Sequence, residues 1–141
     1  MGPLCNIKIS ADGEYIAVGT SNSQLFLSDK NGNELWSKKV TDTFFVSIVV
    51  ISAHGEYIAV DTEKGFFSLF SSFDVYSREG NLLWRYEIKN PLKAIAISGD
   101  GHYLAASDGH ILLIFDNFQA IEEYASSECA QENKVLTVYY L

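Results

Sequence analysis

Basic side chains are scarce in this sequence. Lys and Arg total 10 against 18 Asp and Glu, which gives a formal net charge of −8. A surface with such an excess of negative charge repels nucleic-acid phosphates and anionic lipids. We therefore expect no nucleic acid and no membrane among the partners of this chain.

Long apolar runs and cysteines are scarce as well. The longest apolar run, residues 44–51, is interrupted by Ser47 and is much shorter than the roughly 20 residues that a membrane-spanning helix needs. The N-terminal residues show no signal-peptide pattern. The two cysteines, Cys5 and Cys129, are expected to be free thiols in a reducing, cytoplasmic location, and a disulfide between them is left open.

Signatures of catalysis are also missing. No nucleophile elbow, phosphate-binding loop or dinucleotide-binding fingerprint occurs. His54, His102 and His110 have no spacing suited to zinc, and solvated turn residues are the expected roles of the first two. The oxygen-rich segment 29–34 has its glycine too early for a calcium loop and is expected to be a hairpin turn. The sequence predicts no catalytic residue, metal site or cofactor, and a catalytic triad assembled by the fold remains the open alternative.

A repeated motif dominates what the sequence does contain. The pattern Ile-Ser-x-x-Gly-x-Tyr begins at Ile9, Ile51 and Ile97, so its period is 42 to 46 residues. Periods of this length, made of short apolar runs broken by glycine turns, are typical of β-propeller blades. The sequence predicts an all-β chain of three four-stranded antiparallel blades, at about residues 5–41, 42–90 and 91–141 of a single domain, 1–141.

Each blade is expected to contain short strands that are apolar on both faces, because neighbouring blades cover both faces of each sheet. In blade one the expected strands are residues 6–10, 15–20, 24–29 and 34–40. In blade two they are residues 44–52, 57–62, 73–77 and 82–88. In blade three they are residues 93–98, 103–107 and 110–116. A Gly-Asn-x-Leu-Trp turn recurs in the first two blades, and its Trp36 and Trp84 are expected to be buried between adjacent sheets.

Blade two contains six extra residues, which must lie within 63–72. This insertion carries the apolar residues Phe66, Phe67, Leu69 and Phe70. Either these side chains pack within a longer hairpin, or they form an exposed interaction patch for a partner.

Blade three departs from the pattern after its third strand. The Gly-Asn-x-Leu-Trp turn is replaced by residues 118–131, whose apolar spacing predicts a short helix. Residues 134–140 predict a final strand, which supplies the fourth strand of blade three or of a blade in another subunit. We regard its apolar residues as a candidate assembly segment: Val135, Leu136, Val138, Tyr139 and Tyr140.

The motif Ser-x-Asp-Gly-x-Tyr-Ile-Ala, followed by Leu-Phe-x-x-Asp-x-x-Gly-Asn-x-Leu-Trp, resembles the WD-repeat-like and pyrroloquinoline-quinone-like propeller repeats of many prokaryotic proteins. The resemblance covers three repeats, about residues 6–117. It implies a propeller fold, but propellers serve as scaffolds, ligand binders and enzymes alike. Trp36 and Trp84 match the structural tryptophan of the repeat rather than a quinone clamp, so quinone binding is not favoured.

Three blades are too few for a ring, because closed propellers typically have about four to eight. The end blades would each leave one apolar face uncovered. We therefore predict a non-enzymatic binding or assembly module that completes a ring, as a homodimer of about six blades or by pairing with another protein. The alternatives are an enzyme with its site in the central channel, including a quinone-type oxidoreductase, and a fragment of a larger propeller protein.

Overall fold

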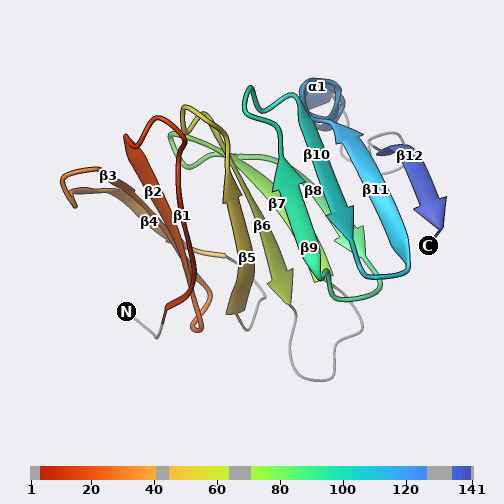
Figure 1. Ribbon diagram of the computed structural model, residues 1–141, viewed down its shortest axis with the longest axis horizontal. Helices are drawn as coiled ribbons and strands as arrows, with labels where there is room; N and C mark the ends of the chain where they lie inside the picture. Colours follow the sequence, from red (N-terminus) through yellow and green to blue (C-terminus); the bar gives the residue numbers. More distant parts are fainter. Residues whose placement is uncertain (1–3, 41–44, 64–70, 127–134, 141) are drawn as a thin grey trace.

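The computed structural model describes residues 4–40, 45–63, 71–126 and 135–140. These residues form three four-stranded antiparallel sheets and one helix. The sheets lie side by side, with the first sheet at one end of the molecule and the third at the other (Figure 1). The predicted all-β propeller-type fold is confirmed, and we call the three sheets blades one, two and three.

Every blade is a meander in which consecutive strands pair. Blade one contains β1 (Leu4–Ile9), β2 (Tyr15–Thr20), β3 (Gln24–Asp29) and β4 (Glu34–Lys39). Blade two contains β5 (Phe45–Ile51), β6 (Tyr57–Glu63), β7 (Ser71–Ser77) and β8 (Leu82–Ile88). Blade three contains β9 (Ala94–Ile97), β10 (Tyr103–Ser107), β11 (Ile111–Asp116) and β12 (Val135–Tyr140). The expected strands agree with these bounds to within one or two residues.

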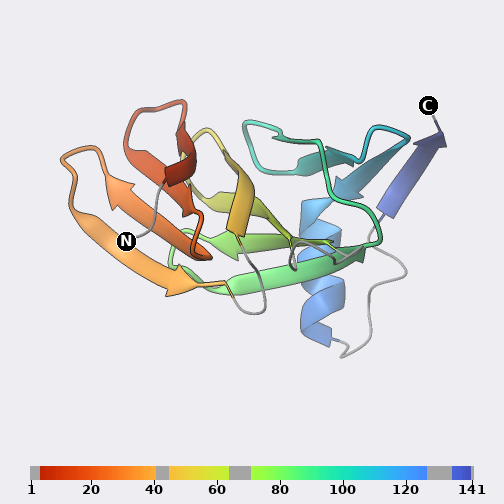
Figure 2. The same cartoon turned by 90° about the horizontal axis from the view of Figure 1, so that it is seen from below.

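The helix α1 (Asn117–Ser126) stands between β11 and β12. Its N-terminus is capped by Asp116, whose Oδ1 accepts a hydrogen bond from the Gln119 N–H at 3.0 Å. The helix contacts β8 of blade two, and Figure 2 shows it beside that strand. The predicted helix is confirmed over 118–126, and its expected end at 131 lies outside the described residues. The strand β12 pairs with β11, so the chain completes blade three with its own fourth strand.

The repeated motif forms the turn between the first two strands of each blade. In blade one, Ser10 Oγ donates to Asp12 Oδ1 at 2.6 Å and accepts from the Tyr15 N–H at 3.0 Å. The same bonds recur in blade three, at 2.7 and 2.9 Å, between the equivalent serine, aspartate and tyrosine. The glycine of the motif has a φ of 74°, 71° and 73° in the three blades, a left-handed conformation that other residues resist. The predicted tight turns are confirmed.

The hydrophobic core lies between the sheets. One cluster joins apolar side chains of blades one and two: Ala17, Leu25, Leu27, Val40, Val46, Val49, Ile58, Val60 and Tyr76. The other joins blades two and three with α1: Val50, Ala59, Phe73, Val75, Trp84, Ile88, Leu92, Leu104, Ala106, Leu113, Phe115 and Ala120. Blade two is therefore covered on both faces.

The two tryptophans link each blade to the next at the outer strands. The Trp36 Nε1–H donates to the carbonyl oxygen of Arg78 in blade two at 2.6 Å, and its ring lies against Gly80. Trp84 is fully buried and donates to Asn117 Oδ1 at 2.7 Å. Asn117, the first residue of α1, thus accepts the indole hydrogen bond that the carbonyl oxygen of Arg78 accepts in the joint between blades one and two. The predicted burial is complete for Trp84, whereas Trp36 stays partly exposed.

We predict that Trp84→Ala lowers the free energy of unfolding by about 3–5 kcal/mol, because the substitution leaves a large cavity and removes the hydrogen-bond donor to Asn117 Oδ1. Trp36→Ala should cost less, because part of that ring is already exposed. Chemical denaturation monitored by circular dichroism measures both. Leu35→Ala, at a residue that is 47% exposed, is the control and should change stability by less than about 0.5 kcal/mol. A loss below about 1 kcal/mol for Trp84→Ala would contradict the packing described here.

Candidate functional site

The two ends of the row of blades carry uncovered sheet faces. In blades two and three, one face of the sheet is turned toward the preceding blade, and we call this the leading face and the opposite face the trailing face. In blade one, the leading face is the one that carries the same register positions. The strand register places Ile7, Ile9, Ile16, Val18 and Phe26 together on the leading face of blade one. Each of these side chains is exposed or half-exposed. The leading face of blade one is therefore an apolar surface in contact with solvent.

The equivalent positions of blade two show what this surface is built for. The register aligns Ile7 with Val49, since each stands opposite a valine of the second strand, Val18 and Val60 respectively. Val49 and Val60 are fully buried against blade one, whereas Ile7 is 55% exposed and Ile9 is 61% exposed. The residue at this position is thus fully buried in blade two, where blade one covers it, and half-buried in blade three, where it is Ile95.

The trailing face of blade three is the second uncovered face. Its apolar members by register are Ala94, Ala96, Ala105, Leu112 and Ile114. The last three are partly exposed, although their equivalents in blades one and two are fully buried: Ala17, Leu25 and Leu27, and Ala59, Phe73 and Val75. A hollow of about 190 Å³ lies on this face, lined by Ala94, Ile95, Ala96, Ala105, Ala106, Ser107 and Leu112.

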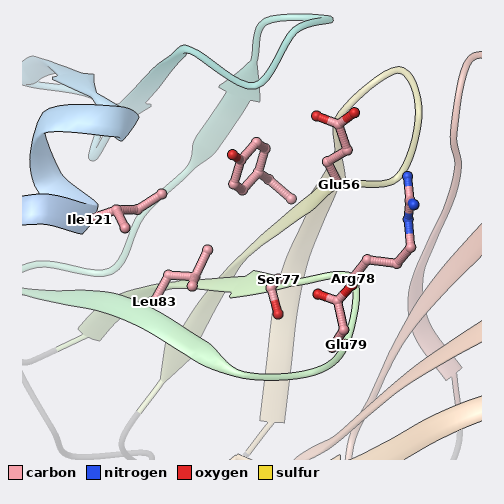
Figure 3. A pocket seen from close by; sticks show the side chains of 7 residues that line it. Glu56, Ser77, Arg78, Glu79, Leu83 and Ile121 are labelled. Atoms are coloured by element: carbon pink, nitrogen blue, oxygen red, sulfur yellow. The ribbon is translucent and has the colours of Figure 1, made fainter. Parts of the chain in front are cut away.

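A separate pocket of about 360 Å³ lies between blade two and α1 (Figure 3). Its apolar wall consists of Tyr57, Leu83 and Ile121, and its polar rim carries the carboxylates of Glu56 and Glu79.

A basic residue, Arg78, also lines this pocket. Arg78 extends away from Leu83 and Ile121 in Figure 3. Its guanidinium donates to the carbonyl oxygen of His54 at 2.5 Å and lies 4.6 Å from the centroid of the Tyr15 ring in blade one. Arg78 therefore joins two blades while its side chain also lines the pocket.

Blade two also contains a buried carboxyl group on its trailing face. Asp61 is fully buried, its Oδ2 accepts a hydrogen bond from Ser47 Oγ at 2.7 Å, and its Oδ1 has no hydrogen-bond partner among the described residues. Burial raises the pKa of Asp61 to about 7, and the negative charges of Glu63 and Asp74 add to the increase. Asp61 does not line the pocket of Figure 3.

A second buried carboxyl group in blade two is paired. Asp74 accepts two hydrogen bonds from the Arg85 guanidinium, at 2.9 and 2.8 Å, and one from Ser72 Oγ at 3.0 Å. These bonds hold the pKa of Arg85 above its usual range. Burial likewise raises the pKa of the neighbouring Tyr76 hydroxyl. The network joins Ser72, Asp74 and Tyr76 of β7 to Arg85, which stands opposite Asp74 on β8, and this cross-strand pair was not expected from the sequence.

The histidines occupy turns, as expected, but they are not equally solvated. His54 Nδ1 lies 3.1 Å from Asp12 Oδ2, and its side chain is largely exposed. His102 is less exposed than expected for a solvated turn residue, because its ring stacks on Tyr103 and Phe118 and its Nε2 lies 3.2 Å from Asp116 Oδ2. Within the described ranges, no group of three or more His, Cys, Asp and Glu residues is placed to hold a metal ion.

The two candidate sites named from the sequence are placed only in part. The interaction patch of Phe66, Phe67, Leu69 and Phe70 lies outside the described residues. The backbone of the assembly segment forms β12, the outermost strand of blade three. In the part of the chain that the structure describes, no helix has the length and apolar character needed to cross a membrane.

We predict that Asp61→Asn removes a pH-dependent loss of stability. Between the ordinary pKa of 3.8 and the folded-state pKa of about 7, the folded protein holds a proton that the unfolded chain has released, so stability falls as pH rises through this window. The loss is at most about 4 kcal/mol, because one pKa unit corresponds to about 1.4 kcal/mol. Urea denaturation of both proteins at pH 4 and pH 8 measures it.

The matched control for this experiment is Asp12→Asn. Hydrogen bonds from Ser10 and the Glu14 N–H lower the pKa of Asp12 to about 2, so its stabilising contribution is present above pH 4 and is lost as pH falls toward 2. The control should not remove the loss between pH 4 and pH 8. Parallel stability curves for the wild type and Asp61→Asn would show that Asp61 ionises freely.

Comparison with solved structures supports the architecture. The crystal structure of the Myceliophteria thermophila Cps50 (Swd1) beta-propeller domain is similar to this chain, with a TM-score of 0.67 and 15% sequence identity. The match covers 96% of this chain and 40% of that one, so the chain spans well under half of the solved propeller. No family model and no curated protein matches the sequence. The likeness establishes the fold, and the chain has the architecture of a β-propeller.

Proposed function

We propose that this protein is a non-enzymatic β-propeller module for binding and assembly, and that its two uncovered sheet faces bind blades of a propeller partner. One observation carries the proposal. Positions that are fully buried between blades within the chain are exposed at its two ends, as Val49 and its equivalent Ile7 show.

The energetics support association. Apolar surface gains about 25 cal/mol for each Å² that is removed from water. Soluble monomers rarely expose a contiguous apolar patch larger than a few hundred Å². Here Ile7 and Ile9 are both more than half exposed on one strand, next to the half-exposed Ile16, Val18 and Phe26. A second sheet packed on this face would cover these side chains, since the equivalents of Ile7, Ile16 and Val18 in blade two are fully buried.

The covering blades have three candidate sources. Two copies of the chain would give a ring of roughly six blades, within the usual range of about four to eight. A different propeller protein is the second source. Further blades of a longer polypeptide are the third, and the match to 40% of a solved propeller domain is compatible with it. The intact mass of the protein from its natural source separates the third from the other two.

The enzyme alternative, including a quinone-type oxidoreductase, has less support. Catalytic groups are expected where a pocket and shifted pKa values coincide. Among the described residues, the carboxyl group with the strongly raised pKa is that of Asp61, and it lies outside both the pocket of Figure 3 and the hollow on blade three. No observation therefore favours a catalytic site.

We predict that the purified chain associates at micromolar concentration and that one charged residue on an uncovered face prevents this. Light scattering should give a mass above the 15.7 kDa of the monomer. Ile9→Asp on blade one and Ala96→Asp on blade three should each return the mass to that of the monomer, because each buries an unpaired charge in the joint. Asn31→Asp, which adds the same charge at an exposed turn, is the control.

A well-behaved monomer at all concentrations would contradict the proposal. Association that persists in both face variants would contradict it as well, because the contact would then lie elsewhere on the surface.

A further inference from the structure

One contact is repeated at each joint between blades. The Tyr15 ring of blade one packs on Gly55 in the motif turn of blade two, and the Tyr57 ring of blade two packs on Gly101 in blade three. A Cβ atom at either glycine would collide with the ring. The motif tyrosine of each blade therefore requires the motif glycine of the next blade.

The ends of the chain carry the two unmatched halves of this contact. Tyr103, the motif tyrosine of blade three, is 48% exposed. Gly13, the motif glycine of blade one, has open space where a Cβ would stand, with no atom within 4 Å. Among the described residues, no motif glycine packs under the Tyr103 ring, and no motif tyrosine packs on Gly13.

The apolar side chains of the first strand in blade one also fit the trailing face of blade three. In the joint between blades one and two, the space above Gly19 is filled by Val46 and Val49. The register aligns Gly19 with Ser107 of blade three, and Ser107 lines the hollow of about 190 Å³ on the trailing face. It also aligns Val49 with the exposed Ile7. An Ile7 side chain from another blade one would thus enter the hollow beside Ser107.

Backbone hydrogen bonds and a basic side chain also occupy repeated positions at the joints between blades. The motif turns of consecutive blades are joined by hydrogen bonds from the Asp12 N–H to the Ala53 carbonyl, at 3.0 Å, and from the Ala53 N–H to the Gly99 carbonyl, at 2.8 Å. The residue of blade one that follows β3 is Lys30, at the position that Arg78 has in blade two. Arg78 lies over the motif tyrosine of the blade before it. In the single chain Lys30 Nζ is paired with Glu14 Oε1 at 2.9 Å, and in the inferred joint Lys30 would stand at the position of Arg78 next to Tyr103 of another chain.

We infer that the partner of both uncovered faces is a second copy of this chain, docked head to tail, with Tyr103 of each copy on the Gly13 turn of the other. The inference rests on the proposed function and identifies its partner. Both joints of the resulting ring use the same contact, and blade three of each copy precedes blade one of the other.

Two positions differ from the joints within the chain. Asp100 stands opposite Asp12 of the second copy, where the joint between blades one and two pairs Asp12 with His54. Like charges at exposed positions repel each other, and salt screens the repulsion. In addition, Thr137 occupies the register position of Trp36 and Trp84, so no tryptophan reaches the Gly32 turn of the second copy. Because salt screens the repulsion between Asp100 and Asp12, association should tighten as the salt concentration rises.

Disulfide trapping tests the inference, with Cys5→Ser and Cys129→Ser as the background. Two variants, Gly13→Cys and Tyr103→Cys, are mixed in equal amounts and oxidised. The mixture should form a cross-linked dimer of twice the monomer mass, and neither variant should form it alone. The internal control carries Tyr15→Cys and Gly55→Cys in one chain, where the two Cβ positions lie 3.1 Å apart. It should form an intramolecular bond.

Each outcome has a defined meaning. Failure of the mixture to cross-link, in a protein that associates through the uncovered faces and in which the control bond forms, overturns the inference and leaves the proposed function standing. A cross-link in the Gly13→Cys variant alone overturns it too, because it shows blade one facing blade one. A protein that stays monomeric overturns both.

A second measurement needs no cysteine. Gly13→Ala adds a methyl group where Tyr103 of the second copy must pack, and it should raise the dissociation constant of the dimer by about tenfold or more. Gly32→Ala is the matched control, because Gly32 also has a positive φ and open space around it. Equal dissociation constants for the two variants would contradict the contact, while the stability of the separate chain should fall similarly in both.

Discussion

The fold depends on one constraint: each sheet is largely apolar on both faces, and mainly a neighbouring sheet covers them. Both hydrophobic clusters join side chains of two neighbouring blades, and α1 contributes to the second. Stability in such a row is approximately the sum of the blades and of the joints between them. Blade two takes part in two joints, whereas blades one and three each take part in one. The properties of the two ends follow from this difference.

The angle between neighbouring sheets is set at both ends of each joint. At the inner end, a tyrosine approaches the next motif turn because glycine has no Cβ, as Tyr57 does at Gly101. At the outer end, an indole N–H is satisfied by the next blade, by a turn carbonyl for Trp36 and by Asn117 for Trp84. An aromatic ring with one polar atom suits this role, since its apolar area packs while the N–H fixes its position.

Much of the fold was predictable, because the repeat signals are local. Alternating apolar runs and left-handed glycines fix strands and turns within a few residues, and three copies of Ile-Ser-x-x-Gly-x-Tyr reinforce one another. The rest depends on contacts between distant residues. The pairing of Asp74 with Arg85, the burial of Asp61 and the contact of Asn117 with Trp84 join separate strands or separate blades. The uncovered faces were expected from the blade count, but the match between Tyr103 and Gly13 required the contacts at Gly55 and Gly101.

The distribution of buried charge differs between the blades, and this difference bears on how the end faces would bind a partner. The register aligns Asp74 of blade two with Phe26 of blade one and Leu113 of blade three. Asp74 is fully buried and paired with Arg85, an arrangement that adds little stability over apolar residues but is costly when one partner is lost. Its position in the blade that is covered on both sides keeps the Asp74 carboxylate out of water, while Arg85 stays partly exposed. Blade one has the apolar Phe26 at the same position, so its leading face carries no buried charge pair for a partner to satisfy. In the association that we propose, recognition at that face would then come from the fit of side chains into a complementary sheet, which is the type of contact that the internal joints already use.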